Sequence, residues 1–174
     1  MQEFIAAGAK PEFLFFWGHR QSGNSISKSC FSQWYESAFD VDDVHYKTAE
    51  HYMMAQKALL FGDNDIYEKI LNSNTPDEAK SLGRKVRGFK DDIWSAKSFD
   101  IVVNGNVEKF SQNEPLRNFL LSTGDKILVE ASPVDPVWGI GLAEGDEQAK
   151  DPTLWRGKNL LGFTLMAVRE KIRK

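Results

Sequence analysis

The amino-acid sequence predicts a single domain in which several helices are combined with a few short strands. Its 174 residues are enough for one domain with a core of ordinary size. Hydrophobic residues make up 41% and charged residues 27% of the chain, which is the profile of a folded soluble protein rather than a disordered one. No repeat, low-complexity tract or linker divides residues 1–174, so we expect one unit, with residues 1–12 loosely ordered.

Four segments have the composition of short strands. The aromatic run Phe13–Trp17 is typical of a buried strand and ends at Gly18. Two apolar triplets on either side of Asp42 and Asp43 predict a hairpin, and a later apolar run predicts another strand. The last three segments are Phe39–Val41, Val44–Tyr46 and Ile127–Glu130. The polar segment 21–29 and the Gly-, Pro- and acid-rich segment 135–151 are predicted loops.

The segment after the hairpin has the most pronounced helical pattern. Thr48 suits an N-cap, Glu50 falls in the first turn, where the helix dipole favours a carboxylate, and Gly62 stops the helix. Apolar residues cover nearly every side, which predicts a buried helix. Its few polar residues therefore require partners or a ligand, and these are Glu50, His51, Gln56 and Lys57.

Further helices are predicted from the signals at their starts. Thr75 followed by Pro76 is an N-cap with a proline at the first helical position. The stretch 99–110 contains a conflict, because its Asn-Gly pair is typical of a hairpin whereas its apolar residues follow helical spacing; we predict a helix. The other predicted helices start at Asp65, near Asp91, at Glu114 (through Leu121) and after Asn159, which we expect to be a cap.

Composition and motifs exclude several classes of function. The net charge of -3 argues against a general polyanion binder, and the single cysteine, Cys30, rules out an intrachain disulfide. The three histidines lack the spacing of a helical zinc motif, and we find no phosphate-binding loop, dinucleotide fingerprint or serine-esterase elbow. We therefore expect no metal and no cofactor. The sequence shows neither a signal-peptide pattern nor an apolar run of bilayer length, so we expect a cytoplasmic protein without a membrane partner.

Glu50 and Lys57 are seven residues apart on the predicted buried helix, which places them on one side of it and about 10 Å apart along its axis. That spacing suits two groups that line one pocket at different depths. In the alternative interpretation, Glu50 only complements the helix dipole and Lys57 extends to solvent. Spacing alone does not decide between them.

Two later segments combine polar, aromatic and basic residues. The loop 132–141 carries Asp135, Trp138 and flexible glycines, although each residue taken alone is expected to cap a turn or to fill the core. Residues 155–159 stand at a helix N-terminus, where free amide N–H groups and nearby cations favour phosphate. The basic cluster at 84–90 is more typical of a solvated face, so 155–159 is the better phosphate candidate.

Segments along nearly the whole chain match a known family in the same order. They are Phe13–Gly18, Phe31–Trp34, Tyr46–Lys57, Leu82–Arg84, Trp94, Asp135–Gly141 and Gly157–Gly162. Together they resemble the NADAR superfamily, specifically the YbiA-like N-glycosidases, over about residues 13–171. Two motifs depart from the family pattern. Ser32-Gln33-Trp34 replaces the frequent Ser-Asn-Phe, and Trp138-Gly139-Ile140 replaces the frequent Trp-Gly-Asp.

The resemblance implies a compact, mainly helical α+β domain with a few short strands, a single YbiA-like domain. It also implies hydrolysis of N-glycosidic bonds. One described activity of the family removes ribose 5-phosphate from ribosylamino-pyrimidine phosphates, which are early riboflavin intermediates, and another branch removes ADP-ribose from guanine bases. By the same resemblance, Glu50, Trp94 and Asp135 are active-site residues. We expect the two departures to affect the choice of substrate more than the reaction.

These observations lead to a mechanistic hypothesis. Glu50 is the principal acid/base group, and Asp135 stabilises the cationic sugar or orients water. Lys57 binds a substrate phosphate or carbonyl, which we favour, or forms a transient imine with the opened ribose. Trp94 completes the predicted catalytic set. The predicted substrate-binding residues are Gly18, His19, Arg20, Trp34, Tyr46, Arg84, Trp138, Gly139, Arg156, Lys158 and Asn159.

The expected partner is a small molecule that contains ribose phosphate or ADP-ribose, and the sequence does not specify the oligomeric state. Two alternatives stay open. One is an ADP-ribosyl-guanine glycohydrolase that acts on modified nucleic acid or nucleosides, which alone would involve nucleic acid. The other is a noncatalytic module that binds NAD or ADP-ribose.

Overall fold

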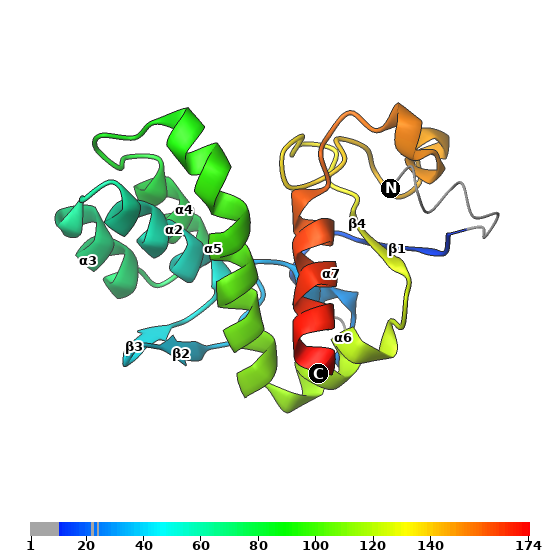
Figure 1. The fold of residues 1–174 in the computed structure, drawn as a ribbon, viewed down its shortest axis with the longest axis horizontal. Helices are drawn as coiled ribbons and strands as arrows, with labels where there is room; N and C mark the ends of the chain where they lie inside the picture. The colour runs from blue at the N-terminus through cyan, green and yellow to red at the C-terminus, as the bar shows by residue number, and fades with distance from the viewer. Residues whose placement is uncertain (1–10, 22, 24) are drawn as a thin grey trace.

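The computed structural model describes residues 11–21, 23 and 25–174, and it has the predicted mainly helical α+β fold with two small sheets (Figure 1). Its elements are β1 Phe13–Phe16, η1 Lys28–Phe31, β2 Phe39–Val41, β3 Val44–Tyr46, α2 Ala49–Leu60, α3 Asn64–Asn72, α4 Pro76–Gly83, α5 Asp91–Gln112, α6 Glu114–Ser122, β4 Ile127–Glu130, η2 Glu147–Lys150, η3 Pro152–Leu154 and α7 Leu160–Arg173. Figure 1 shows α2–α4 on one side, β1, β4 and α7 on the other, and α5 between them. The predictions for residues 1–10 and for the loop residues 22 and 24 lie outside the described residues.

β1 and β4 pair in parallel, with Phe16 opposite Glu130 at the end of the ladder. α7 packs against β4. Leu128 belongs to the main core, whereas Val129 belongs to a smaller cluster formed with the loop that follows β4. Because side chains alternate along a strand, Glu130 lies on the same face as Leu128, toward the main core.

The predicted strand at Phe13–Trp17 is one residue too long. β1 ends at Phe16, and Trp17 is 58% exposed. Gly18 follows with a positive φ of 82°, which turns the chain away. The strand is also less buried than predicted, because the sheet has two strands and leaves one edge of β1 without a partner strand in the described chain.

The predicted hairpin is confirmed over β2 and β3. Phe39 pairs with Tyr46, and the connecting residues Asp42 and Asp43 have φ values of 49° and 63°. Two consecutive residues with positive φ form the turn that matches the right-handed twist of paired strands.

α2 is the buried helix that the sequence predicts, and α3, α4 and α5 all pack on it. The Thr48 hydroxyl caps it by accepting the backbone N–H of His51 at 3.3 Å. The contact with α4 is close, since a Cβ placed on Gly83 would lie 2.1 Å from Sδ of Met54. α4 has the predicted Thr75 cap, whereas α3 begins one residue earlier than predicted because Asp63 is its N-cap.

The structure resolves the conflict at 99–110 in favour of a helix, since α5 is continuous through it. Gly105 of the Asn-Gly pair lies against α2, where an added Cβ would come within 2.3 Å of the Tyr52 ring. Asn106 is fully buried and donates to Oε1 of Gln33 at 2.8 Å. Packing of the helically spaced apolar residues therefore overrides the local turn signal.

The predicted loop 135–151 is largely irregular, but it contains the short 3-10 helix η2 near its end. Among the described helices, none is both long and apolar enough to cross a membrane.

Candidate active site

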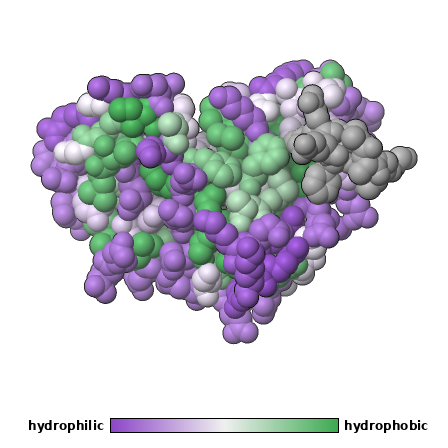
Figure 2. Space-filling model, in the orientation of Figure 1, coloured by the Kyte–Doolittle hydropathy of each residue, from purple (hydrophilic) through white to green (hydrophobic). Residues whose placement is uncertain are grey.

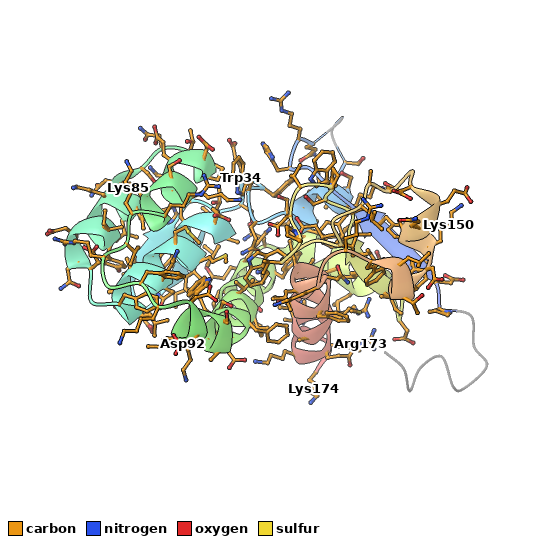
Figure 3. All side chains as sticks on the ribbon, turned by 90° about the horizontal axis from the view of Figure 1, so that it is seen from above. Trp34, Lys85, Asp92, Lys150, Arg173 and Lys174 are labelled. Carbon is orange, nitrogen blue, oxygen red and sulfur yellow. The ribbon has the colours of Figure 1, made fainter. Side chains whose placement is uncertain are left out.

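A pocket of about 620 Å3 lies between the α2–α4 side and the β4–α7 side of the molecule. Figure 2 shows the surface notched between these two sides, and in Figure 3 Trp34 lies between them when the molecule is seen from above. The charged and aromatic residues that line the pocket are Glu50, Asp91, Glu130, Asp135, Lys57, Lys80, Arg84, Lys158, Trp34, Trp94 and Trp138.

Glu50 comes from the first turn of α2 and is 5% exposed. Its backbone N–H donates to the carbonyl of Gln33 at 2.9 Å, which ties the start of α2 to the loop that carries Trp34. Burial raises the pKa of Glu50 to about 7; the Lys80 cation opposes this rise and the Asp135 carboxylate adds to it. At neutral pH the carboxyl group is therefore present in both protonation states.

A second carboxyl group, that of the partly buried Glu130, reaches the pocket from the end of β4. Burial is the largest cause that raises its pKa, to about 8, and the carboxylates of Asp135 and Glu50 add to it. Its Oε2 is buried without a hydrogen-bond partner among the described residues.

Asp135 lies in the loop after β4 and has both of the roles that the sequence suggested, a turn cap and a residue of the functional site. Its Oδ1 accepts the backbone N–H groups of Val137 at 2.9 Å and Trp138 at 2.8 Å, so it does cap a turn. The same carboxylate lines the pocket and acts on the ionisation of Glu50 and Glu130. Trp138 likewise packs on the core and lines the pocket.

Lys57 lines the same pocket as Glu50, as the spacing of the two residues on α2 predicts. Its Nζ lies 4.2 Å from the centre of the Phe89 ring and 5.6 Å from that of Trp94. Burial lowers the pKa of Lys57, and the Glu50 carboxylate partly offsets this effect. The ammonium group is thus held over an aromatic wall instead of extending freely into solvent.

The other cations around the pocket lie on or next to α4 and α7. Lys80 and Arg84 are one turn apart on and just after α4, and the Lys80 ammonium lies 5.6 Å from the Trp34 ring centre. Lys158 precedes α7. Arg87, from the same basic cluster as Arg84, instead forms ion pairs with Asp63 and Asp65 at the start of α3.

The structure contradicts the main argument for a phosphate site at 155–159, which was that this helix N-terminus has free backbone N–H groups. The backbone N–H groups at this end of α7 are not free, since carbonyls of residues 136–140 accept from Arg156, Lys158, Asn159 and the first two helix residues. The Arg156 guanidinium binds the Gln148 side chain, and Arg156 does not line the pocket. Of the three residues predicted in this segment, the structure places Lys158 at the pocket.

Asn159 is a structural residue and not the side-chain cap that we expected. It is fully buried in the left-handed region, with φ 53°, and its side chain makes no capping bond. Instead its Oδ1 accepts the backbone N–H of Glu130 at 2.9 Å, and its Nδ2 donates to the Leu128 carbonyl at 3.0 Å. These bonds fix the end of β4, and with it the position of Glu130.

Five other predicted substrate-binding residues do not line this pocket. Tyr46 is 2% exposed and packs in the core against the rings of Phe39 and Tyr52. Gly139 is buried against Gly157. A Cβ added to Gly157 would lie 2.3 Å from the carbonyl oxygen of Gly139.

Of the remaining three residues, His19 and Arg20 lie in a neighbouring hollow with Tyr35. The His19 ring is 5.6 Å from that of Trp34, so this hollow adjoins the pocket. Gly18, just before them, is exposed at the turn after β1.

Sequence reasoning missed three charged residues of the pocket, Lys80, Asp91 and Glu130. Glu130 had a detectable signal, because a charged residue at the end of a buried strand, on the face of Leu128, requires a partner or a ligand. Lys80 had a weaker one, its spacing of four residues from Arg84 on a predicted helix. Serine, amide and apolar residues that were also missed are Ser32, Gln33, Ser95, Ser98, Met53, Met54, Val134, Val137, Leu160 and Leu161.

The pocket has the composition of a site for a polar, partly aromatic ligand. Over residues 11–21, 23 and 25–174, no group of three or more His, Cys, Asp or Glu side chains is arranged to hold a metal ion.

The sequence profile of the NADAR domain matches residues 15–173. The chain belongs to the NADAR domain family.

Relatives of this NADAR chain have informative names. An N-glycosidase of Acanthamoeba polyphaga mimivirus is 44% identical over 165 residues, which cover 92% of this chain and 96% of the relative. A chloroplastic riboflavin biosynthesis protein of Zea mays is 36% identical over 135 residues, which cover 73% of this chain and 20% of the maize protein. The NMR structure of the Escherichia coli protein YbiA matches the fold with a TM-score of 0.74 and 27% identity, and the match covers 95% of this chain and 87% of that one.

Proposed function

We propose that this NADAR chain, a hydrolase of N-glycosyl compounds, cleaves the ribosyl C–N bond of ribosylamino-pyrimidine phosphates and releases ribose 5-phosphate. The observation that carries the proposal is a pocket in which two carboxyl groups with raised pKa values, those of the buried Glu50 and the partly buried Glu130, lie beside tryptophans and cations. The names of the mimivirus and maize relatives support the reaction and the class of substrate.

Cleavage of a ribosyl C–N bond makes two demands on the site. Positive charge builds on C1 and the ring oxygen, and the departing nitrogen requires a proton. Glu50 meets the need for proton transfer, because a carboxyl group with a pKa of about 7 both gives and accepts protons at neutral pH. The Asp135 carboxylate, which two backbone N–H groups hold in place, stabilises the cationic sugar or orients the water.

The other pocket residues suit the two ends of the substrate. Trp94 and Trp138 offer flat faces for the pyrimidine, and Arg84 and Lys158 offer charge for the phosphate. Lys57, held over aromatic rings, binds a phosphate or carbonyl oxygen in this proposal. Borohydride trapping tests the imine alternative, because a stable sugar adduct on Lys57 would replace the binding role by a covalent one.

The proposal is tested by mass spectrometry of the products from a panel of ribosylamino-pyrimidine phosphates and ADP-ribosylated guanosine. Release of free aminopyrimidine and ribose 5-phosphate from the first group is the expected result. Release of ADP-ribose from guanosine, with no turnover of the first group, would replace the proposed substrate. Tight binding of ADP-ribose without any product, unchanged in a Glu50→Gln variant, would instead identify a noncatalytic module.

A further inference from the structure

Glu130 brings a carboxyl group into the pocket that the fold itself does not use. Its backbone is fully occupied: the N–H donates to the Asn159 side chain at 2.9 Å, and the carbonyl accepts from the N–H of Ile140 at 2.9 Å. Its Oε2, in contrast, is buried and has no partner in the described part of the chain. A buried polar atom that the protein leaves unpaired is costly, and here it belongs to a residue that lines a cavity.

The charged groups near Glu130 favour its protonated form. Burial is the main cause, and the carboxylates of Asp135 and Glu50 act in the same direction, while the Lys80 cation opposes them in part. The resulting pKa of about 8 lies above that of Glu50, at about 7. Two carboxyl groups whose environments separate their acidities are suited to separate acid and base roles.

The other elements around β4 do not change this balance. β1, the paired strand, consists of Phe-Leu-Phe-Phe and has no ionisable side chain. Arg169 of α7 binds the carbonyl of Lys126, at the opposite end of β4 from Glu130. Before α7, Lys158 lines the pocket, whereas the Arg156 guanidinium binds the Gln148 side chain.

We infer that Glu130 is a second catalytic residue, which holds a proton in the free enzyme and gives it to the leaving nitrogen of the substrate. The inference rests on the proposed function and divides its chemistry between two carboxyl groups. Glu130 lines the pocket, its Oε2 has no partner among the described residues, and Asn159 holds its backbone in place.

The step balances without any further reactant. The C1–N bond breaks, its electron pair stays on the nitrogen, and that nitrogen takes the proton of the Glu130 carboxyl. Water adds to the cationic C1 and gives a proton to the Glu50 carboxylate. Exchange with solvent then returns a proton to Glu130 and removes one from Glu50, so the sum is hydrolysis to an amine and ribose 5-phosphate.

The test compares Glu130→Gln with wild type on two substrates. One is a ribosylamino-pyrimidine phosphate, whose leaving nitrogen needs a proton, and the other is nicotinamide mononucleotide, whose leaving nitrogen is already cationic. Loss of a proton donor should reduce kcat at least ~100-fold on the first. It should also abolish the decline of wild-type activity above about pH 8, since that decline reports the ionisation of Glu130. Hydrolysis of the mononucleotide should be nearly unchanged.

Two further variants separate chemistry from structure. Glu130→Asp keeps a titrating carboxyl group and should recover part of the activity together with a shifted alkaline decline. Glu68→Gln removes an exposed carboxyl on α3 and should match wild type. The inference is overturned if wild type is active and Glu130→Gln keeps both its kcat and its alkaline decline, or loses activity equally on the two substrates where wild type hydrolyses both. If wild type releases no ribose 5-phosphate, the proposed function itself fails.

Discussion

Replacing Glu50 by glutamine is expected to remove most turnover and, at the same time, to stabilise the fold at neutral and alkaline pH. The folded pKa is raised from 4.5 to about 7 because the carboxyl group is buried. A tenfold change in the acid constant corresponds to about 1.4 kcal/mol, so ionised Glu50 lowers the free energy of unfolding by about 3 kcal/mol. Glutamine has nearly the same shape and cannot ionise.

The sign of the effect defines the pH range to be measured. For a carboxyl group whose folded pKa is raised, its stabilising contribution is complete below the unfolded pKa of 4.5 and is lost as the pH rises through about 7. Urea unfolding of wild type and Glu50→Gln between about pH 4 and about pH 8 should therefore show a difference that grows by about 3 kcal/mol. In melting temperature this corresponds to roughly 6–12 °C for a domain of this size.

The matched control is Glu68→Gln, which removes an exposed carboxyl group and should differ from wild type by a constant amount across the pH range. Activity of each variant on a ribosylamino-pyrimidine phosphate is measured in parallel. A stability difference for Glu50→Gln that does not change with pH would refute the buried, pKa-shifted carboxyl. Near-normal kcat in that variant would refute its role as an acid/base group.

Three more variants test other parts of the site. Lys80→Met removes a cation that lowers the pKa of both Glu50 and Glu130, so the acidic limb of the pH–rate profile should move to higher pH; an unmoved limb would contradict this. Trp94→Ala should weaken substrate binding by about 1–3 kcal/mol through loss of base stacking, seen as a higher KM that Trp94→Phe largely restores. Asn159→Ala removes two buried hydrogen bonds to β4 and should lower the free energy of unfolding in urea by about 2–4 kcal/mol, whereas an effect below experimental error would exclude the structural role.

The parts of the fold that the sequence predicted are those set by neighbouring residues. The Thr48 cap, the Thr75-Pro76 helix start and the Asp42-Asp43 turn each depend on a few consecutive positions, and all three appear as expected. Glu50 and Lys57 share one pocket because both lie on a single helix. Helical geometry alone relates these two side chains.

The parts that the sequence did not predict depend on contacts between distant segments. Free amides at the start of α7 were expected from its cap position, but the loop at 136–140 folds back and uses them. Asn159 bonds to β4, 29 residues earlier, instead of to its own helix. Glu130 and Lys80 line one pocket because the fold brings β4 and α4 to it, and no local pattern specifies that arrangement.

Hydrolysis in oxygen-18-labelled water tests most directly whether this pocket cleaves a ribosyl C–N bond with Glu50. Wild type and Glu50→Gln are incubated with a ribosylamino-pyrimidine phosphate, and the products are weighed by mass spectrometry. Wild type should release free aminopyrimidine and ribose 5-phosphate in amounts far above the enzyme-free control. The label should be on C1 when the sugar is reduced at once to block exchange, and Glu50→Gln should give little of either product. Equal release by the two proteins, or no ribose 5-phosphate from wild type, would contradict the account.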